Sequence, residues 1–240
     1  MAMKFARDIG RFRLDRVVIL LLLLVAMLVA GRAWMHAHPQ HNPWASLNLA
    51  HEPGWATDRK LGSLRGDPAE CRAVLERSGV PFATLDPTGE GACRMEDRTV
   101  LSEAPLHPVQ PASTCAVAAG LEYWQRHGLR QAADVLGSPV ARIEHVGTHS
   151  CRRMYGRDEG PWSEHATANA IDVTGFVLED GRRISVLEGW QGDTPEAEFL
   201  RRARDGACEA FGTVLSPDYN AAHADHLHLD QQGRLWGVCR

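Results

Sequence analysis

The chain has 240 residues, of which 44% are hydrophobic, so it is long enough to bury the core of one ordinary domain with an appendage. Its formal net charge at pH 7 is -4 and no long basic run follows the first residues, which argues against a nucleic-acid-binding protein. No internal repeat and no low-complexity tract interrupts the sequence, so one globular domain is expected.

An apolar segment near the N-terminus predicts a membrane-spanning helix over residues 17–35. It begins VVILLLLLVAMLVA and ends with Trp34 at a position suited to the membrane interface. Residues 1–16 are basic, so the positive-inside rule places them in the cytoplasm and the rest of the chain across the membrane. Ala30 or Ala33 could instead end a signal-peptide cleavage site. We favour an uncleaved anchor because the leucine block is long and the cleavage signal is loose.

Residues 36–58 are rich in His, Pro and Asn and show no helical or strand periodicity. They predict a linker between the membrane and a domain over 59–240. His36, His38 and His41 could bind a metal ion as a cluster, but histidines in a Pro-interrupted linker are more often solvated.

Two helices are predicted in the first half of the domain. The first covers residues 67–79, where Asp67 supplies the N-cap and a proline follows in the first turn. The second covers residues 113–128, where Ser113 or Thr114 supplies the cap.

The second half of the domain alternates strands with one more helix. A strand entering a loop is predicted over 140–151, a hairpin with an Asp-Gly turn over 170–189, and a helix over 194–212. Short strands are predicted over 223–230 and 231–238. This succession predicts an α+β fold with a small antiparallel sheet flanked by helices.

All cysteines follow the apolar segment, as expected for a domain in an oxidising compartment. They form no CxxC pair, which favours disulfides over a cysteine zinc knuckle. The six are Cys71, Cys93, Cys115, Cys151, Cys208 and Cys239. Pairing of nearest neighbours would join Cys71 to Cys93, Cys115 to Cys151, and Cys208 to Cys239, although about 15 connectivities are possible.

Three separated stretches concentrate side chains that can do chemistry, and the first is THSCRRMYGR, residues 148–157. In SEHATANAID, residues 163–172, small residues separate His165 from Asp172. An Asp at the start of a hairpin is costly if it is buried without a cation or donors. In HADHLHLD, residues 223–230, strand alternation puts the last two histidines and the final Asp on one face.

Together the second and third stretches supply two imidazoles and a carboxylate, which is the ligand set of a catalytic zinc that keeps a fourth position for water. Each signal is weak alone. A His-x-His on a strand is more often a pair of half-exposed histidines, and an isolated Asp near a hairpin usually caps a turn. The combination is more specific because one exported chain offers all three ligands and candidate bases.

The pattern Ser163-x-His165-x-x-Ala168-x-Ala170-x-Asp172, followed by His-x-His, resembles motifs of a known group of proteins. These are the SxHxxGxAxD and HxH motifs of the zinc peptidases grouped with D-Ala-D-Ala carboxypeptidases and the hedgehog signalling domain. Residues 42–240 more closely resemble the bacterial extensin-like C-terminal domain family, through stretches such as SCRRMYG and FGTVLSPDYNAAHADHLHLD. The chain departs from the peptidases where alanine replaces the glycine of the motif.

The resemblance implies a hedgehog/D-Ala-D-Ala peptidase-like fold with zinc held by His165, Asp172 and His228. It also implies that Arg152 binds a substrate carboxylate, and Arg153 is the adjacent alternative. The structural alternative is an arginine that only forms an ion pair on the surface.

For the catalytic base the resemblance leaves two residues open, because relatives differ. His226 is the first histidine of the HxH motif, and Asp225 lies three positions before His228. Strand alternation favours His226, which shares a face with His228.

The expected protein is therefore a periplasmic zinc metallopeptidase, anchored in the bacterial inner membrane, that acts on peptidoglycan peptides. The alternative is a non-catalytic cell-wall-binding or scaffolding module whose metal site is structural or vestigial.

Overall fold

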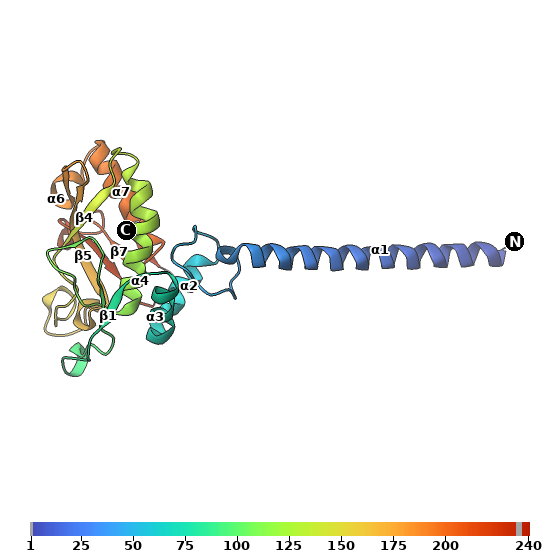
Figure 1. The fold of residues 1–240 in the computed structure, drawn as a ribbon, viewed down its shortest axis with the longest axis horizontal. Coiled ribbons are helices and arrows are strands. Elements are labelled where there is room, and N and C mark those ends of the chain that lie inside the picture. Colours follow the sequence, from blue (N-terminus) through green and yellow to red (C-terminus); the bar gives the residue numbers. More distant parts are fainter. Residues whose placement is uncertain (1, 234–236) are drawn as a thin grey trace.

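The computed structural model describes residues 2–233 and 237–240, and a long N-terminal helix projects from one end of the folded domain (Figure 1). This helix, α1, covers Ala2–Ala37. Its part from Arg13 to Ala37 is apolar and long enough to cross a membrane, and it is not buried against the domain. The predicted helix is confirmed, and a signal sequence would have the same length and composition.

Residues 36–58 differ from the expected stalk because part of them folds onto the domain. A short 3-10 turn, η1, covers Pro39–His41. Beyond it Leu47 and Leu49 join the hydrophobic core. The amide of Leu49 donates to Ser78 Oγ at 2.9 Å, and its carbonyl accepts from His127 Nε2 at 2.8 Å. The packed part of the chain therefore extends upstream of residue 59.

The helices begin where the capping residues predict. Asp67 accepts a hydrogen bond from the amide of Glu70, and Thr114 accepts one from Val117. The helices of the domain are α2 (Thr57–Ser63), α3 (Pro68–Arg77), α4 (Cys115–Tyr123), α5 (Arg130–Ala133), α6 (Val186–Gly189) and α7 (Pro195–Cys208). A π-helical segment, η4 (Trp124–Leu129), joins α4 to α5, so the predicted helix continues past its expected end at residue 128. Short 3-10 turns cover Leu64–Gly66 (η2) and Gly91–Cys93 (η3).

The described strands form two sheets. The small sheet pairs β1 (Phe82–Thr84) with β2 (Thr99–Leu101). The main sheet has the order β3-β4-β5-β8-β7-β9, with β6 paired to β5. Its strands are β3 (Leu106–His107), β4 (Val140–His145), β5 (Ala170–Leu178), β6 (Arg183–Ser185), β7 (Thr213–Leu215), β8 (Leu227–Asp230) and β9 (Val238–Cys239). Of the strand expected over 231–238, residues 234–236 lie outside the described residues.

The main sheet is antiparallel at its centre and parallel at both edges. The pairs β4–β5, β5–β8 and β8–β7 are antiparallel, whereas β3–β4 and β7–β9 are parallel. The expectation of an antiparallel sheet was therefore wrong at the edges, because β3 and β9 enter the sheet from distant segments rather than from hairpins. The α+β class is confirmed.

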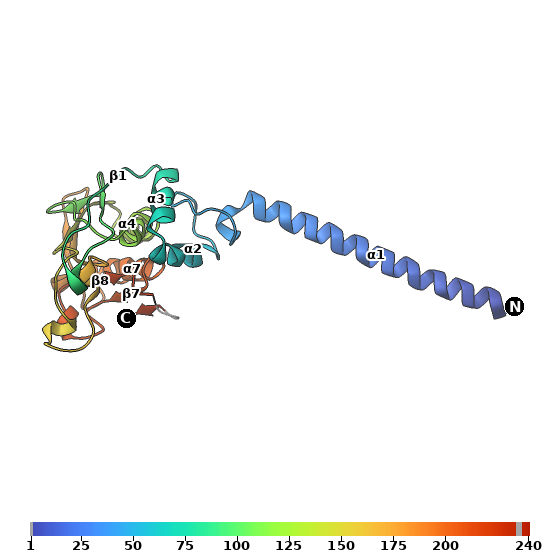
Figure 2. The same ribbon diagram turned by 90° about the horizontal axis from the view of Figure 1, so that it is seen from below.

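The helices and the sheet share one core, in which α4 and α7 lie on the same side of the sheet (Figures 1 and 2). Phe176 on β5 contacts Trp124 edge to face at 5.9 Å and Phe199 of α7 at 5.1 Å between ring centroids. The indole of Trp124 also donates to the carbonyl of Ala203 at 2.8 Å. This aromatic group fixes the central strand against the helices.

Disulfides connect three distant pairs of segments, and two of the three expected pairings were wrong. Cys71 pairs with Cys115 between α3 and α4, and Cys93 pairs with Cys151. The pairing of Cys208 with Cys239, which ties α7 to β9, is confirmed. Proximity in sequence misleads because α3 packs on α4, so the buried Cys71 and Cys115 face each other across a helix contact.

The crossing of α7 with the π-helical segment depends on two glycines. A Cβ added to Gly206 would lie 2.7 Å from the Cα of Gly128. We expect Gly206→Ala to destabilise the protein by about 1–3 kcal/mol, because overpacking outweighs the gain in helix propensity. Gly62→Ala, near the end of α2, is the matched control, since its nearest neighbour would lie 3.9 Å away. Chemical denaturation of the detergent-solubilised chain measures both, and equal stability of the two variants would contradict the close crossing.

Candidate metal centre

The register between β5 and β8 places Asp172 directly opposite His228. On β8 the side chains alternate as predicted, because Leu227 and Leu229 are fully buried in the core and His228 faces the other side. On β5 the register with β4 shifts between Glu144 and His145, which leaves an extra residue at Thr174.

This β-bulge changes which side chains of β5 point into the core. Ile171 and Val173 before it and Phe176 and Leu178 after it all belong to the core. Asp172 is therefore directed away from the core, toward His228, while both halves of a long strand remain packed.

His165 reaches the same place from the short 3-10 turn η6, Glu164–Thr167, which ends shortly before β5. Ser163 caps the turn by accepting the amide of His165. Ala168 ends it in the left-handed conformation, with φ 57° and ψ 29°. The alanine of the motif therefore occupies a position whose backbone conformation favours glycine.

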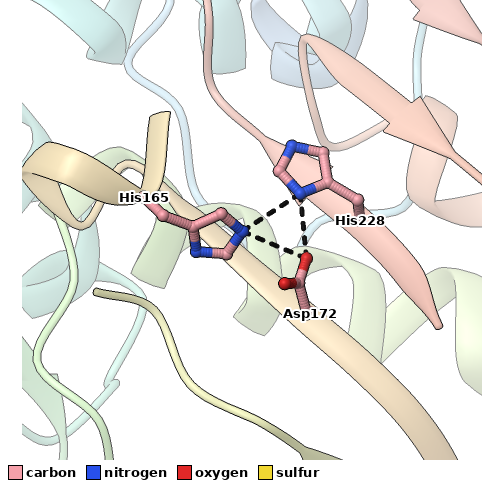
Figure 3. Close-up of side chains that lie close together, drawn as sticks. All are labelled: His165, Asp172 and His228. Atoms are coloured by element: carbon pink, nitrogen blue, oxygen red, sulfur yellow. Dashed lines mark hydrogen bonds and ion pairs between the residues drawn. The ribbon is translucent and has the colours of Figure 1, made fainter. Parts of the chain in front are cut away.

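The three predicted ligands converge, as Figure 3 shows. Nε2 of His165 lies 3.1 Å from Nδ1 of His228 and 3.1 Å from Oδ1 of Asp172. His228 Nδ1 lies 2.9 Å from the same carboxylate oxygen. The side chains are only 4%, 12% and 13% exposed for His165, His228 and Asp172, so one small triangle of donor atoms is shielded from bulk water.

Neighbouring acceptors fix which ring nitrogen faces the triangle. His165 Nδ1 donates to the carbonyl of Thr148 at 3.0 Å, so its Nε2 is left toward the other ligands. His228 Nε2 donates to the buried carboxylate of Asp230 at 3.1 Å, so its Nδ1 is left in the same way. Such outer partners orient histidine ligands at metal sites.

In the metal-free chain the cluster is an ion-pair network. Burial opposes ionisation, yet the adjacent imidazoles of His165 and His228 hold the pKa of Asp172 well below its usual range. Burial likewise disfavours the charged imidazole, but Asp172 and Asp230 together raise the pKa of His228 to about 9. His228 thus carries a proton at neutral pH, and a metal ion that binds Nδ1 would displace it.

The donor set fits a divalent metal ion. Ligand atoms about 2 Å from a tetrahedral zinc lie roughly 3.3 Å from one another, close to the separations of the triangle. Two imidazoles and a carboxylate leave one coordination position open. His165, Asp172 and His228 are therefore the residues that would hold the ion.

The two candidate bases form a pair instead of competing. His226 Nδ1 lies 2.8 Å from the carboxylate of Asp225, and His226 Nε2 lies 3.6 Å from Oδ1 of Asp172. Asp225 is 63% exposed and does not face the triangle, whereas His226 lies beside it. The geometry makes His226 the group near the ligands and Asp225 the group that orients it.

A cavity of about 140 Å³ opens beside the ligands and contains one histidine to which the sequence assigned no role. His223 lies in the 3-10 turn η7, Ala221–His223, with its ring 5.3 Å from His226 and 5.8 Å from His228 between centroids. Burial, together with those two histidines, lowers the pKa of His223 to about 4, so the ring is neutral. Its Nδ1 donates to Asn220 Oδ1 at 2.8 Å. His223 lies three residues before the HxH motif, and this proximity was the sequence signal that could have identified it.

The two candidate arginines differ in their contacts. Arg153 packs over the ring of Trp162 at 4.5 Å and donates to the carbonyl of Gly160. Arg152 lines the cavity, and within the described residues its guanidinium makes no hydrogen bond or ion pair. The loop that carries both includes the turn η5, Met154–Gly156, and is held by the Cys93–Cys151 disulfide.

Comparison with known proteins identifies one family. A family model described as extensin-like protein C-terminus matches residues 69–240, which include every ligand and both candidate bases. No curated protein and no solved structure matches the chain.

Substitutions of Ala168, whose backbone is left-handed, test the effect of having alanine in place of the glycine of the motif. In Ala168→Gly, relief of about 1–2 kcal/mol of backbone strain opposes a lost buried methyl and the greater entropy of unfolded glycine. We therefore expect the free energy of unfolding to stay within about 1 kcal/mol of wild type and metal affinity to be unchanged. Ala168→Val should destabilise by about 2 kcal/mol or more, since the side chain is fully buried and β-branched at positive φ. Wild-type stability of the valine variant in denaturant titrations would contradict the left-handed position.

The carboxylate behind His228 gives a test of the metal site. Asp230→Asn should lower Zn²⁺ affinity about 10- to 100-fold, because the amide holds the imidazole less strongly in the required tautomer. Calorimetric Zn²⁺ titration measures it, with exposed Asp193→Asn as the control of equal charge change. Unchanged affinity in a folded Asp230→Asn variant would show that His228 is not a ligand through Nδ1.

Proposed function

The chain belongs to the extensin-like protein C-terminus family, and from that premise and its ligand geometry we propose that it is a zinc metallopeptidase acting on peptidoglycan peptides. In this proposal α1 anchors the chain in the bacterial inner membrane and the domain lies in the periplasm. The disulfides support an oxidising compartment, and the apolar helix supports export.

One observation carries the proposal: three largely buried metal-type ligands open onto a cavity. The cavity is also lined by His226, paired with Asp225, and by Arg152, which makes no side-chain hydrogen bond or ion pair within the described residues. A purely structural metal site is closed by a fourth protein ligand, whereas a catalytic site keeps a position open. Within the described residues the metal-type cluster comprises His165, Asp172 and His228.

We propose in addition that the fold is of the D-Ala-D-Ala peptidase and hedgehog type. The support is the arrangement of the motif: the first ligand lies on a turn, the second on the following central strand, and the third on the adjacent antiparallel strand. The Ser, Ala and Ala positions of the motif each have a backbone role there, as cap, left-handed residue and buried strand start.

The reaction is hydrolysis of an amide: water oxygen adds to the carbonyl carbon, the C–N bond breaks, and the amine leaves with a proton. When bound, a zinc ion polarises the carbonyl and lowers the pKa of a water molecule toward neutrality. His226, oriented by Asp225, accepts the proton of the attacking water and passes it to the leaving amine. Arg152 binds a carboxylate of the stem peptide at the cavity.

Muropeptide digestion followed by mass spectrometry tests the function in the Zn²⁺-loaded, detergent-solubilised chain. We expect His226→Gln to bind Zn²⁺ as wild type does and to hydrolyse about 10²–10⁴-fold more slowly, because proton transfer is lost. Asp225→Asn should cause a smaller decrease, and His51→Gln, an exposed histidine outside the site, should cause none.

The outcomes separate the enzyme from its alternative. Zn²⁺ binding without cleavage of any stem or cross-linked peptide by wild type would favour a non-catalytic wall-binding module. Full activity of His226→Gln would refute its role as the base, and failure of wild type to bind Zn²⁺ would refute the metal centre.

A further inference from the structure

We propose that the residues around the outer end of α1 form a membrane-docking surface that rests on the lipid headgroups and directs the cavity away from the bilayer. The surface comprises Arg32, Trp34, Trp44 and Trp55. The inference depends on the proposed anchor, and it adds a lipid contact and a fixed orientation.

The two tryptophans of the domain in this surface are unusually exposed. Trp44 and Trp55 are 83% and 73% exposed, the highest values among the large hydrophobic side chains of the described residues. Trp34, in the last turns of α1, is 46% exposed. Indole rings at such positions are favoured where a membrane meets water, because one part of the ring is apolar and the N–H is a donor.

The position of Trp44 beside the end of α1 matches the boundary between membrane and water. The apolar part of the helix, Arg13–Ala37, has 25 residues and is about 37 Å long, which exceeds a hydrocarbon core of about 30 Å. Its last turns therefore lie at headgroup level. Trp44 lines a hollow with Val29, Arg32 and His36 of those turns, so its ring folds back beside the helix.

The chemistry of this hollow suits a phospholipid. Arg32 can extend its guanidinium to a phosphate while its methylenes stay in the apolar region, and Trp44 covers the glycerol level. Near Trp55 a second hollow is lined by Asp58 and Glu209, so acidic groups accompany Arg32 and this mixed charge does not demand anionic lipid. We therefore identify the partner as the bilayer interface itself, including zwitterionic lipid.

Ring stacking and a hydrogen bond connect the end of α1 to the domain, so contact with the membrane would fix the orientation of the domain. Trp34 stacks on His38 at 4.6 Å and on His41 at 5.3 Å between centroids. The buried ammonium of Lys60 donates to the carbonyl of Pro39 at 2.7 Å. Because these bonds tie the end of α1 to the start of α2, the domain does not hang on a free stalk.

The backbone of the joint is also closely packed. A Cβ at Gly54 would lie 2.5 Å from the carbonyl oxygen of Gln40, so only glycine allows these two backbone segments to approach so closely. The amide of Ala56 donates to the same carbonyl at 3.3 Å.

The loop that forms one wall of the cavity lies on the far side of the domain from this joint (Figures 1 and 2). The loop with Met154–Gly156, which lines the cavity, is at the end opposite to α1 in both ribbon views (Figures 1 and 2). A domain seated on the docking surface would present Arg152 and His226 toward the cell wall. The substrates reached are then peptides of the assembled wall, rather than peptides held at the membrane surface.

Tryptophan quenching in the full chain, reconstituted in phosphatidylcholine vesicles, tests the docking surface. Lipids brominated near the headgroup end of the acyl chains quench only rings at that depth. We expect the Trp44→Phe/Trp55→Phe variant to lose most of this quenching, with Trp34 supplying the remainder. Trp162→Phe, at the cavity loop, is the matched control; it should keep the bromolipid quenching and lose part of the quenching by aqueous acrylamide.

Each outcome bears on the inference. Wild-type bromolipid quenching in the double variant would overturn the docking surface, and loss of it in Trp162→Phe would overturn the orientation. A mature chain whose mass shows cleavage after Ala30 or Ala33 would overturn both. The measurement uses neither Zn²⁺ nor peptide, so a chain that docks without hydrolysing would refute the proposed function alone.

Discussion

The pairing of β5 with β8, which sets Asp172 opposite His228, is the constraint on which the candidate site depends. A slip of one residue would turn either side chain into the core. On β5 the bulge at Thr174 keeps Asp172 out of the core. Odd-numbered residues such as Ile171 face the core before the bulge, and even-numbered residues such as Phe176 face it afterwards. The third ligand then needs only a short turn before β5, which η6 provides.

The residues visible to sequence reasoning were those that periodicity governs. Strand alternation placed His226 and His228 on one face, and a costly Asp at a strand start marked Asp172. The partners that orient the ligands were not visible. The carbonyl of Thr148 has no side-chain signature, and the contact of Asp230 with its strand neighbour follows from rotamers that alternation does not determine.

Long-range contacts account for the other differences between sequence and structure. The disulfide between Cys71 and Cys115 depends on the packing of α3 against α4, which no local pattern encodes. Leu47 and Leu49 lie in a segment without periodicity, yet they fill the core beside α3. Such a segment is read as a linker because its order comes from tertiary contacts rather than from its own secondary structure.

The charge arrangement explains how the ligands can stay together without an ion. An isolated buried Asp172 would be strongly unfavourable, but protonated His228 bridges it to Asp230. A divalent ion would take the place of that proton and meet the same carboxylate. Unlike a zinc finger, whose fold requires its metal, this chain already holds its ligands by strand pairing, disulfides and a buried core. The fold therefore does not depend on a bound metal ion to bring these residues together, and their open side faces the cavity.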